Sequence, residues 1–225
     1  MLARKRPGKS GGTALSEKEL EALARYVYRA YAALPEADGK QVDPELLAGK
    51  LLGLRVVYRR LSRDGSILGI TAPAAVGVPV LEGDGMGWFF LDGRTILLEE
   101  RLLGPWASRG RRRFTLMHEV GHRLLGFVQN GPDEAQANRL ASALLMPEAL
   151  LGRYLRALGW TPGPVPDRRL DPERYRTFTA LAEAMGVSRQ ALAIRLEQLG
   201  LTGQRKGWTL RPVPVLTTGE GETEG

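Results

Sequence analysis

The chain has 225 residues, a formal net charge of +7 and no cysteine. This length allows one sizeable hydrophobic core, alone or with a small appended unit. The absence of cysteine excludes a disulfide framework and a thiolate metal site. No apolar run approaches the roughly 18 residues of a membrane-spanning helix, and residues 1–13 lack the apolar core of a signal peptide. We therefore expect a cytoplasmic protein that does not contact a membrane.

Basic residues concentrate in two places. Arg4, Lys5, Arg6 and Lys9 form a basic arm, and Arg109 with residues 111–113 forms an arginine run. Such charge fits a solvated surface and contact with nucleic acid equally well, so both interpretations stay open.

The first segments are predicted to be helical after a disordered basic arm at residues 1–12. Ser16 and Glu19 form a capping box, and apolar residues follow at helical spacing as far as Tyr31. A second helix is expected from Asp43 or Pro44 to Leu52, because aspartate is a good N-cap and proline suits the first helical position.

A change of period then predicts a small antiparallel or mixed sheet. Five β-rich segments separated by turn residues are expected at 54–58, 66–71, 75–81, 87–91 and 95–99. Asp92-Gly93 separates the last two segments, so these two are predicted to pair as a hairpin.

The next helix, predicted over residues 111–127, contains the only two histidines of the chain, His118 and His122, with Glu119 directly after the first. Side chains four residues apart lie on the same face of a helix, so both imidazoles can bind one metal ion. This is the H-E-x-x-H spacing of zinc proteases, in which the glutamate is the general base. We predict a zinc site, which manganese could also occupy, with Glu119 as the catalytic residue.

A catalytic zinc site needs a third protein ligand and one open position. Without further histidine or any cysteine, this ligand must be a carboxylate. Glu134 is predicted to supply it, because it opens the helix that returns after the Asp133 cap and lies on the inward stripe of that helix. Asn138, one turn later, either orients a ligand or has a structural part. The group that stabilises the oxyanion is unassigned, with Tyr154 and Arg139 as candidates.

The remaining chain is predicted to be helical around a proline-rich linker. After the helix that ends before Pro147, helices are expected at 148–158, 172–185 and 189–199, with the linker at 159–171 and a mostly disordered tail at 203–225. The last two helices, within residues 172–202, resemble a helix-turn-helix whose second helix would expose Arg189, Gln190, Ala193 and Glu197. A tight helical hairpin without DNA contact has the same spacing.

Three stretches resemble the ImmA/IrrE metallopeptidases: residues 113–122, 134–141 and 144–147. The likeness extends over roughly residues 40–200, with Met117 standing where alanine is common. It implies that His118, His122 and Glu134 bind zinc and that Glu119 is catalytic. Residues 13–158 would then form the metallopeptidase domain. We expect the chain to lack the further C-terminal sensory domain that some family members carry.

The expected fold class is therefore α+β: a small sheet packed against a metal-binding helical hairpin, with a C-terminal helix-turn-helix-like subdomain. The resemblance implies an endopeptidase that cleaves a protein substrate, a helix-turn-helix repressor, and thereby derepresses stress, DNA-repair or mobile-element genes. Two alternatives stay open. One is a DNA-binding regulator with a structural metal site, and the other is a component of a toxin–antitoxin or phage module.

Overall fold

The structure is a computed structural model that describes residues 14–105, 107–126 and 134–202. The elements are α1 (Glu17–Ala32), α2 (Pro44–Leu46), π-helical η1 (Leu47–Leu51), β1 (Arg55–Arg59), β2 (Gly69–Thr71), β3 (Ala75–Glu82), β4 (Gly85–Asp92), β5 (Thr95–Glu99), 3-10 helical η2 (Glu100–Leu103), α3 (Arg109–Gly126), α4 (Glu134–Leu145), α5 (Glu148–Ala157), α6 (Pro172–Met185) and α7 (Arg189–Gln198). The predicted arm at 1–12, the Asp133 cap and the tail at 203–225 lie outside the described residues.

The N-terminal helices begin at the caps that the sequence predicts. The Ser16 side chain accepts a hydrogen bond from the Glu19 amide, and the Glu19 carboxylate accepts one from the Ser16 amide at 2.7 Å. Asp43 caps α2 by accepting from the amides of residues 45 and 46. The second predicted helix continues as the π-helical turn η1 rather than as α-helix.

The strands form a mixed three-stranded sheet in the order β1-β5-β2 and a two-stranded antiparallel ribbon of β3 and β4. The predicted pairing of β4 with β5 across Asp92-Gly93 is therefore wrong. β5 instead pairs in parallel with β1 and antiparallel with β2. All five residues of β5 are buried, and a strand buried on both faces is more stable in the centre of a sheet than beside an edge ribbon.

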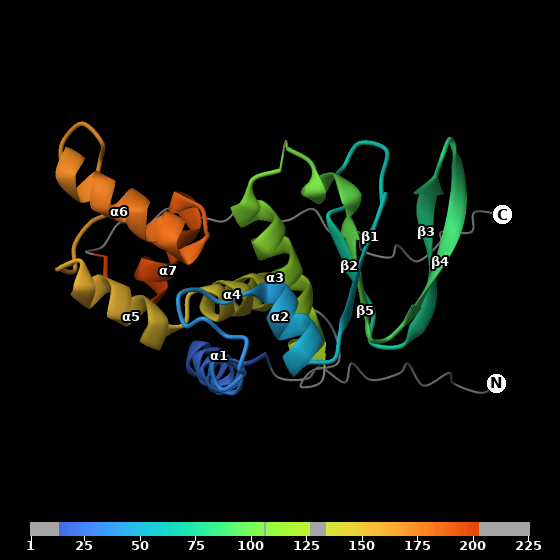
Figure 1. The fold of residues 1–225 in the computed structure, drawn as a ribbon, viewed down its shortest axis with the longest axis horizontal. Coiled ribbons are helices and arrows are strands. Elements are labelled where there is room, and N and C mark those ends of the chain that lie inside the picture. The colour runs from blue at the N-terminus through green and yellow to red at the C-terminus, as the bar shows by residue number, and fades with distance from the viewer. Residues whose placement is uncertain (1–13, 106, 127–133, 203–225) are drawn as a thin grey trace, which may run out of the picture.

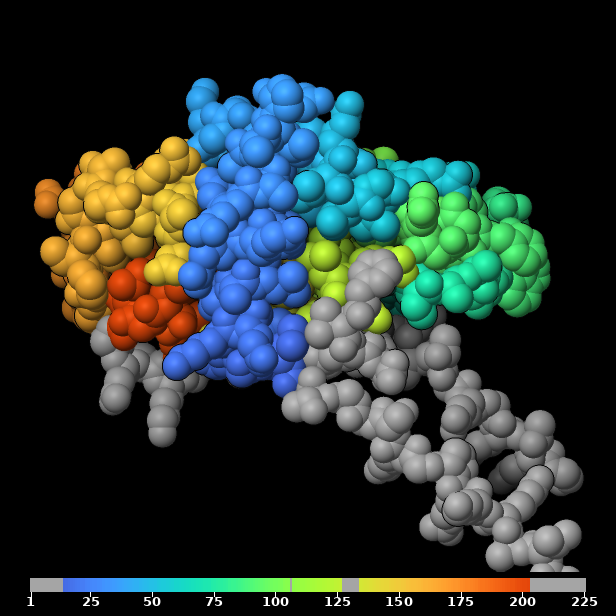
Figure 2. Space-filling view, turned by 90° about the horizontal axis from the view of Figure 1, so that it is seen from below, coloured from blue at the N-terminus to red at the C-terminus, as the bar shows by residue number. Residues whose placement is uncertain are grey.

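Helix α3 lies between the sheet and the remaining helices (Figure 1). It contacts β2 and β5 on one side and α4 on the other, and α1 packs on α4. Seen from below, α1 crosses the middle of the molecule between the strands and helices α5 to α7 (Figure 2). One apolar core includes side chains of all the α-helices from α3 to α7 together with α1 and β5. The predicted α+β class is confirmed.

None of the helices in the described ranges is both long enough and apolar enough to cross a bilayer.

Candidate metal centre

Helix α3 carries the two histidines and is held firmly at its start by a buried arginine. The Arg113 guanidinium donates to the carbonyl of Val42 at 2.6 Å and to that of Gly186 at 3.0 Å. These carbonyls precede α2 and follow α6, so one side chain ties three helical segments together. Ten residues of α3 are buried, among them His118 and Glu119. The helix that carries the two histidines is therefore held in place by the hydrogen bonds of Arg113 and by its buried side chains.

His118, His122 and Glu134 converge at the contact between α3 and α4. The Nε2 atoms of the two histidines are 3.0 Å apart. Glu134 places one carboxylate oxygen 3.2 Å from His118 Nε2 and the other 3.1 Å from His122 Nε2. His118 is fully buried, whereas the Glu134 side chain is 42% exposed. The structure thus brings together the three ligands that the sequence predicts, and the group is open to solvent on the side of Glu134.

Asn138 sets the protonation of His118. The Asn138 Oδ1 atom lies 3.0 Å from His118 Nδ1, so this ring nitrogen carries the proton and donates it to the amide oxygen. Burial and, to a smaller extent, the nearby His122 lower the pKa of His118 to about 4, and the hydrogen bond to Asn138 opposes this shift. The ring is therefore neutral at pH 7, and its Nε2 presents a lone pair toward Glu134.

The charge state of this group favours a bound cation. His118 Nε2 and the Glu134 carboxylate are both acceptors, so their approach to 3.2 Å is unfavourable without a cation between them. Ligand atoms around a tetrahedral zinc ion at about 2.0–2.1 Å are about 3.3 Å apart, close to the separations found here. All three donor groups lie within 4.8 Å of one another. Two imidazoles and one carboxylate therefore fit a divalent transition metal such as zinc or manganese.

Glu119 is not one of these three residues. It lies on α3, the helix that carries the two histidines. The residue is 5% exposed. Burial and, to a smaller extent, the negative charge of Glu134 raise the pKa of Glu119 to about 8. A carboxyl group with a pKa near neutrality, close to a metal group, is suited to take up and release a proton.

Gly121 allows α3 and α4, the two helices of the metal group, to approach closely. A Cβ atom at Gly121 would lie 3.0 Å from the carbonyl oxygen of Ala137. The sequence-based prediction assigned no role to Gly121, although a glycine in a helix interior costs about 1 kcal/mol relative to alanine and usually has a packing reason. Here the reason is that α4 must bring Glu134 within reach of both histidines.

The two candidates for oxyanion stabilisation are engaged elsewhere. The Tyr154 hydroxyl donates to the Lys40 carbonyl at 2.9 Å. Arg139 forms an ion pair with Glu17 at 2.6 Å. Neither side chain is therefore assigned to the metal group.

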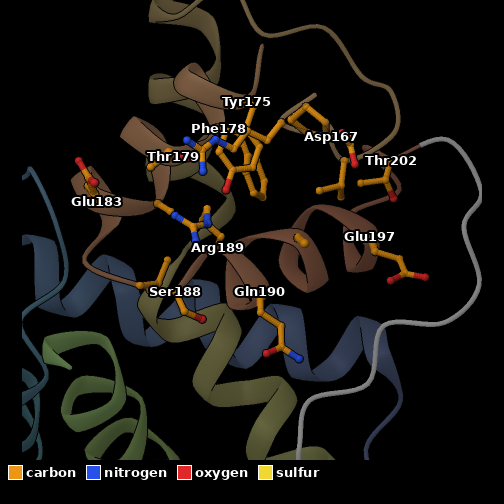
Figure 3. A pocket seen from close by; sticks show the side chains of 16 residues that line it. Asp167, Tyr175, Phe178, Thr179, Glu183, Ser188, Arg189, Gln190, Glu197 and Thr202 are labelled. Atoms are coloured by element: carbon orange, nitrogen blue, oxygen red, sulfur yellow. The ribbon is translucent and has the colours of Figure 1, made fainter. Parts of the chain in front are cut away.

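A pocket of about 730 Å³ lies away from this centre, between residues 165–168 of the proline-rich linker, α6 and α7 (Figure 3). Arg189 lies over the ring of Tyr175 at its wall. The sequence predicts four side chains on the exposed face of α7. Ala193 is buried, whereas Arg189, Gln190 and Glu197 are exposed. Six consecutive residues of α7 from Ala191 to Leu196 are buried, so the helix offers a narrow exposed face of mixed charge.

Comparison with known proteins identifies one family. Residues 94–197 match the model of the Peptidase_M78 family, the IrrE N-terminal-like domain. The matched stretch begins before β5, includes the whole metal group and ends in α7. A search of curated proteins finds no match to the chain.

Proposed function

Residues 94–197 of the chain belong to the ImmA/IrrE metallopeptidase family, and we propose that the protein is a zinc-dependent endopeptidase. One observation supports this function above others. His118, His122 and Glu134 converge on one point. A second glutamate, the buried Glu119, is not part of this group and lies on the helix that carries the histidines. Metallopeptidases need these two components, a metal held by three protein ligands and a separate general base.

His118, His122 and Glu134 would hold the metal. When bound, the ion supplies Lewis acidity toward the scissile carbonyl and the attacking water. Asn138 keeps the proton of His118 on Nδ1, which leaves Nε2 free for the ion. Glu119 takes the proton of the attacking water and passes it to the leaving amine. Its raised pKa favours this exchange, because the group can be both base and acid near pH 7.

The substrate that we propose is a helix-turn-helix repressor, whose cleavage would derepress stress, DNA-repair or mobile-element genes. The family assignment supports this choice. We do not extend the proposal to DNA binding by α7. Its exposed side chains include Glu197 as well as Arg189, and a helix that reads DNA normally presents a broader basic surface.

A DNA-binding regulator with a structural metal site is the competing function. A structural zinc site uses four protein ligands, whereas the group found among the described residues has three. The buried Glu119 also has no function in a structural site. Both observations favour the peptidase.

The test incubates the purified protein with zinc and with repressors from its own genome, followed by intact-mass spectrometry. We expect two defined fragments from one repressor, and none without metal or with Glu119→Gln. Metal content of the Glu119→Gln protein should equal that of the parent. Equal cleavage by the parent and Glu119→Gln would remove the proposed mechanism, and undiminished zinc in His118→Ala would remove the assigned site.

A further inference from the structure

Gly69 lies directly against the side chain of Glu119. The residue is the first of β2, an edge strand of the three-stranded sheet, and this strand contacts α3. A Cβ atom at this position would overlap the Glu119 Oε1 atom and would lie 2.8 Å from its Cγ and Cδ atoms. These are the three nearest atoms that such a Cβ would meet, so the space beside Gly69 is filled by one side chain.

Backbone conformation does not explain this glycine. Gly69 is absent from the glycines with positive φ, and it pairs with Leu98 in the regular ladder between β2 and β5. Glycine in a strand loses more conformational entropy on folding than alanine and provides no side chain for packing. The approach of Glu119 is the feature of the structure that requires a residue without a Cβ.

The backbone of Glu119 has little freedom to move. It lies in the middle of α3, where the adjacent residues His118 and Val120 are fully buried. The helix cannot shift without moving the metal-binding histidines with it. A Cβ at position 69 must therefore be accommodated by rotation of the Glu119 side chain, which carries the carboxyl group away from its present place.

We infer that Gly69 is a positioning residue for Glu119. The Cα of Gly69, which carries no side chain, forms one wall of the space that the Glu119 carboxyl group occupies. This contact fixes the carboxyl group beside the metal ligands. The catalytic part of this inference rests on the proposed peptidase function. Gly69 also lies outside the stretch matched by the family model, so this contact adds a residue from an earlier strand to the site.

The first experiment needs neither substrate nor metal. We measure the thermal midpoint of Gly69→Ala in two backgrounds, the parent and Glu119→Ala, after chelation. In the parent, we expect a fall of about 3 °C or more, because the new methyl group overlaps the glutamate. In Glu119→Ala the overlap is gone, and the same substitution should cause no fall. Gly85→Ala is the matched control, since its Cβ would meet only the Glu82 carbonyl oxygen at 3.8 Å.

The second experiment uses the repressor identified by the cleavage screen. Gly69→Ala should lower kcat about 100-fold, as expected for a misplaced catalytic group, while KM changes less than about threefold. Zinc affinity, measured by competition with a chelating dye, should stay within about twofold of the parent, because the ligands are untouched.

The two experiments separate the failure of this inference from failure of the proposed function. An equal fall in thermal midpoint in both backgrounds, or a parental kcat in Gly69→Ala, would overturn the positioning role. If the stability of Gly69→Ala depends on Glu119 but the parent cleaves no repressor, the contact stands and the peptidase function is wrong.

Discussion

Asn138 Oδ1 accepts a hydrogen bond from His118 Nδ1 across the contact between α4 and α3, and the two atoms are 3.0 Å apart. Asn138 lies one turn after Glu134 on the same helix. Helix α4 thus supplies one metal ligand and also the group that orients another. The affinity for metal must therefore depend on how closely α3 and α4 approach, as well as on the three ligands.

The substitution Asn138→Leu should weaken metal binding by about 10- to 100-fold, the usual effect of removing the partner of a histidine ligand. Without the acceptor, the Nδ1 proton of the buried His118 loses its partner, and the Nε2 tautomer competes for the proton. Affinity is measured by competition with a chelating dye. Asn138→Asp is the control, because it keeps an acceptor and should retain most of the affinity. Parental affinity in Asn138→Leu would show that the hydrogen bond does not control the ligand.

Gly121→Ala should reduce both stability and metal affinity. The added methyl group would lie 3.0 Å from the backbone oxygen of Ala137, and backbone atoms yield less easily than side chains. We expect a loss on the order of 1–3 kcal/mol in urea unfolding, the usual cost of overpacking. Gly126→Ala in the same helix is the control, because its Cβ would meet no atom within 4 Å. Equal stability of the two variants would contradict the close contact of α3 with α4.

Much of the fold follows from local sequence patterns, and those parts were predictable. The Ser16 capping box and the Asp43 cap depend on residues two or three apart, and the structure contains both. The juxtaposition of His118 and His122 follows from the helical repeat alone. Glu134 could be chosen by elimination, since a carboxylate was the remaining ligand type and the returning helix placed it inward.

The parts that could not be predicted depend on residues distant in sequence. The Asp92-Gly93 turn resembles a hairpin locally, yet β5 pairs with β1 and β2 because its buried residues occupy the centre of the sheet. The contact of Gly69 with Glu119 joins a strand to a helix, and no spacing rule connects the two. A glycine inside a β-rich segment was the available signal, since such glycines often mark a close approach.

The metal-free protein should lose stability between pH 5 and pH 8 through Glu119. Burial raises the pKa of this group from 4.5 to about 8 in the folded state. The unfolded chain therefore releases the proton at lower pH than the folded protein does, which favours unfolding as the pH rises from 4.5 to 8. The full effect is on the order of 4 kcal/mol.

Glu119→Gln cannot ionise, so its stability should decline less than that of the parent over this range. Urea unfolding of both chelated proteins at pH 5, 6.5 and 8 measures the difference. Since His118 is present in both, its own titration cancels in the comparison. Parallel curves for the two proteins would mean that Glu119 ionises as an ordinary exposed carboxyl group.

The buried pair of Arg195 and Glu21 should be essential for the packing of α7. Arg195 is fully buried, its Nη2 lies 2.9 Å from a Glu21 oxygen, and its Nε donates to the Met146 carbonyl at 3.0 Å. Arg195→Met removes the partner of a partly buried carboxylate, so we expect a loss of about 3 kcal/mol in urea unfolding, the lower end for a buried pair. The exposed Arg189→Met on the same helix should change stability by less than about 0.5 kcal/mol.

Adding Glu21→Gln to Arg195→Met should recover part of the lost stability, because it removes the unpaired charge. The same comparison bears on contact with nucleic acid. The Arg195 guanidinium is held between α1, α4 and α7, so it is not available to bind a phosphate. A loss below about 1 kcal/mol in Arg195→Met would show that the pair does not hold α7 in place. Arg195 could then turn outward, and the basic character of the exposed α7 face would have to be reconsidered.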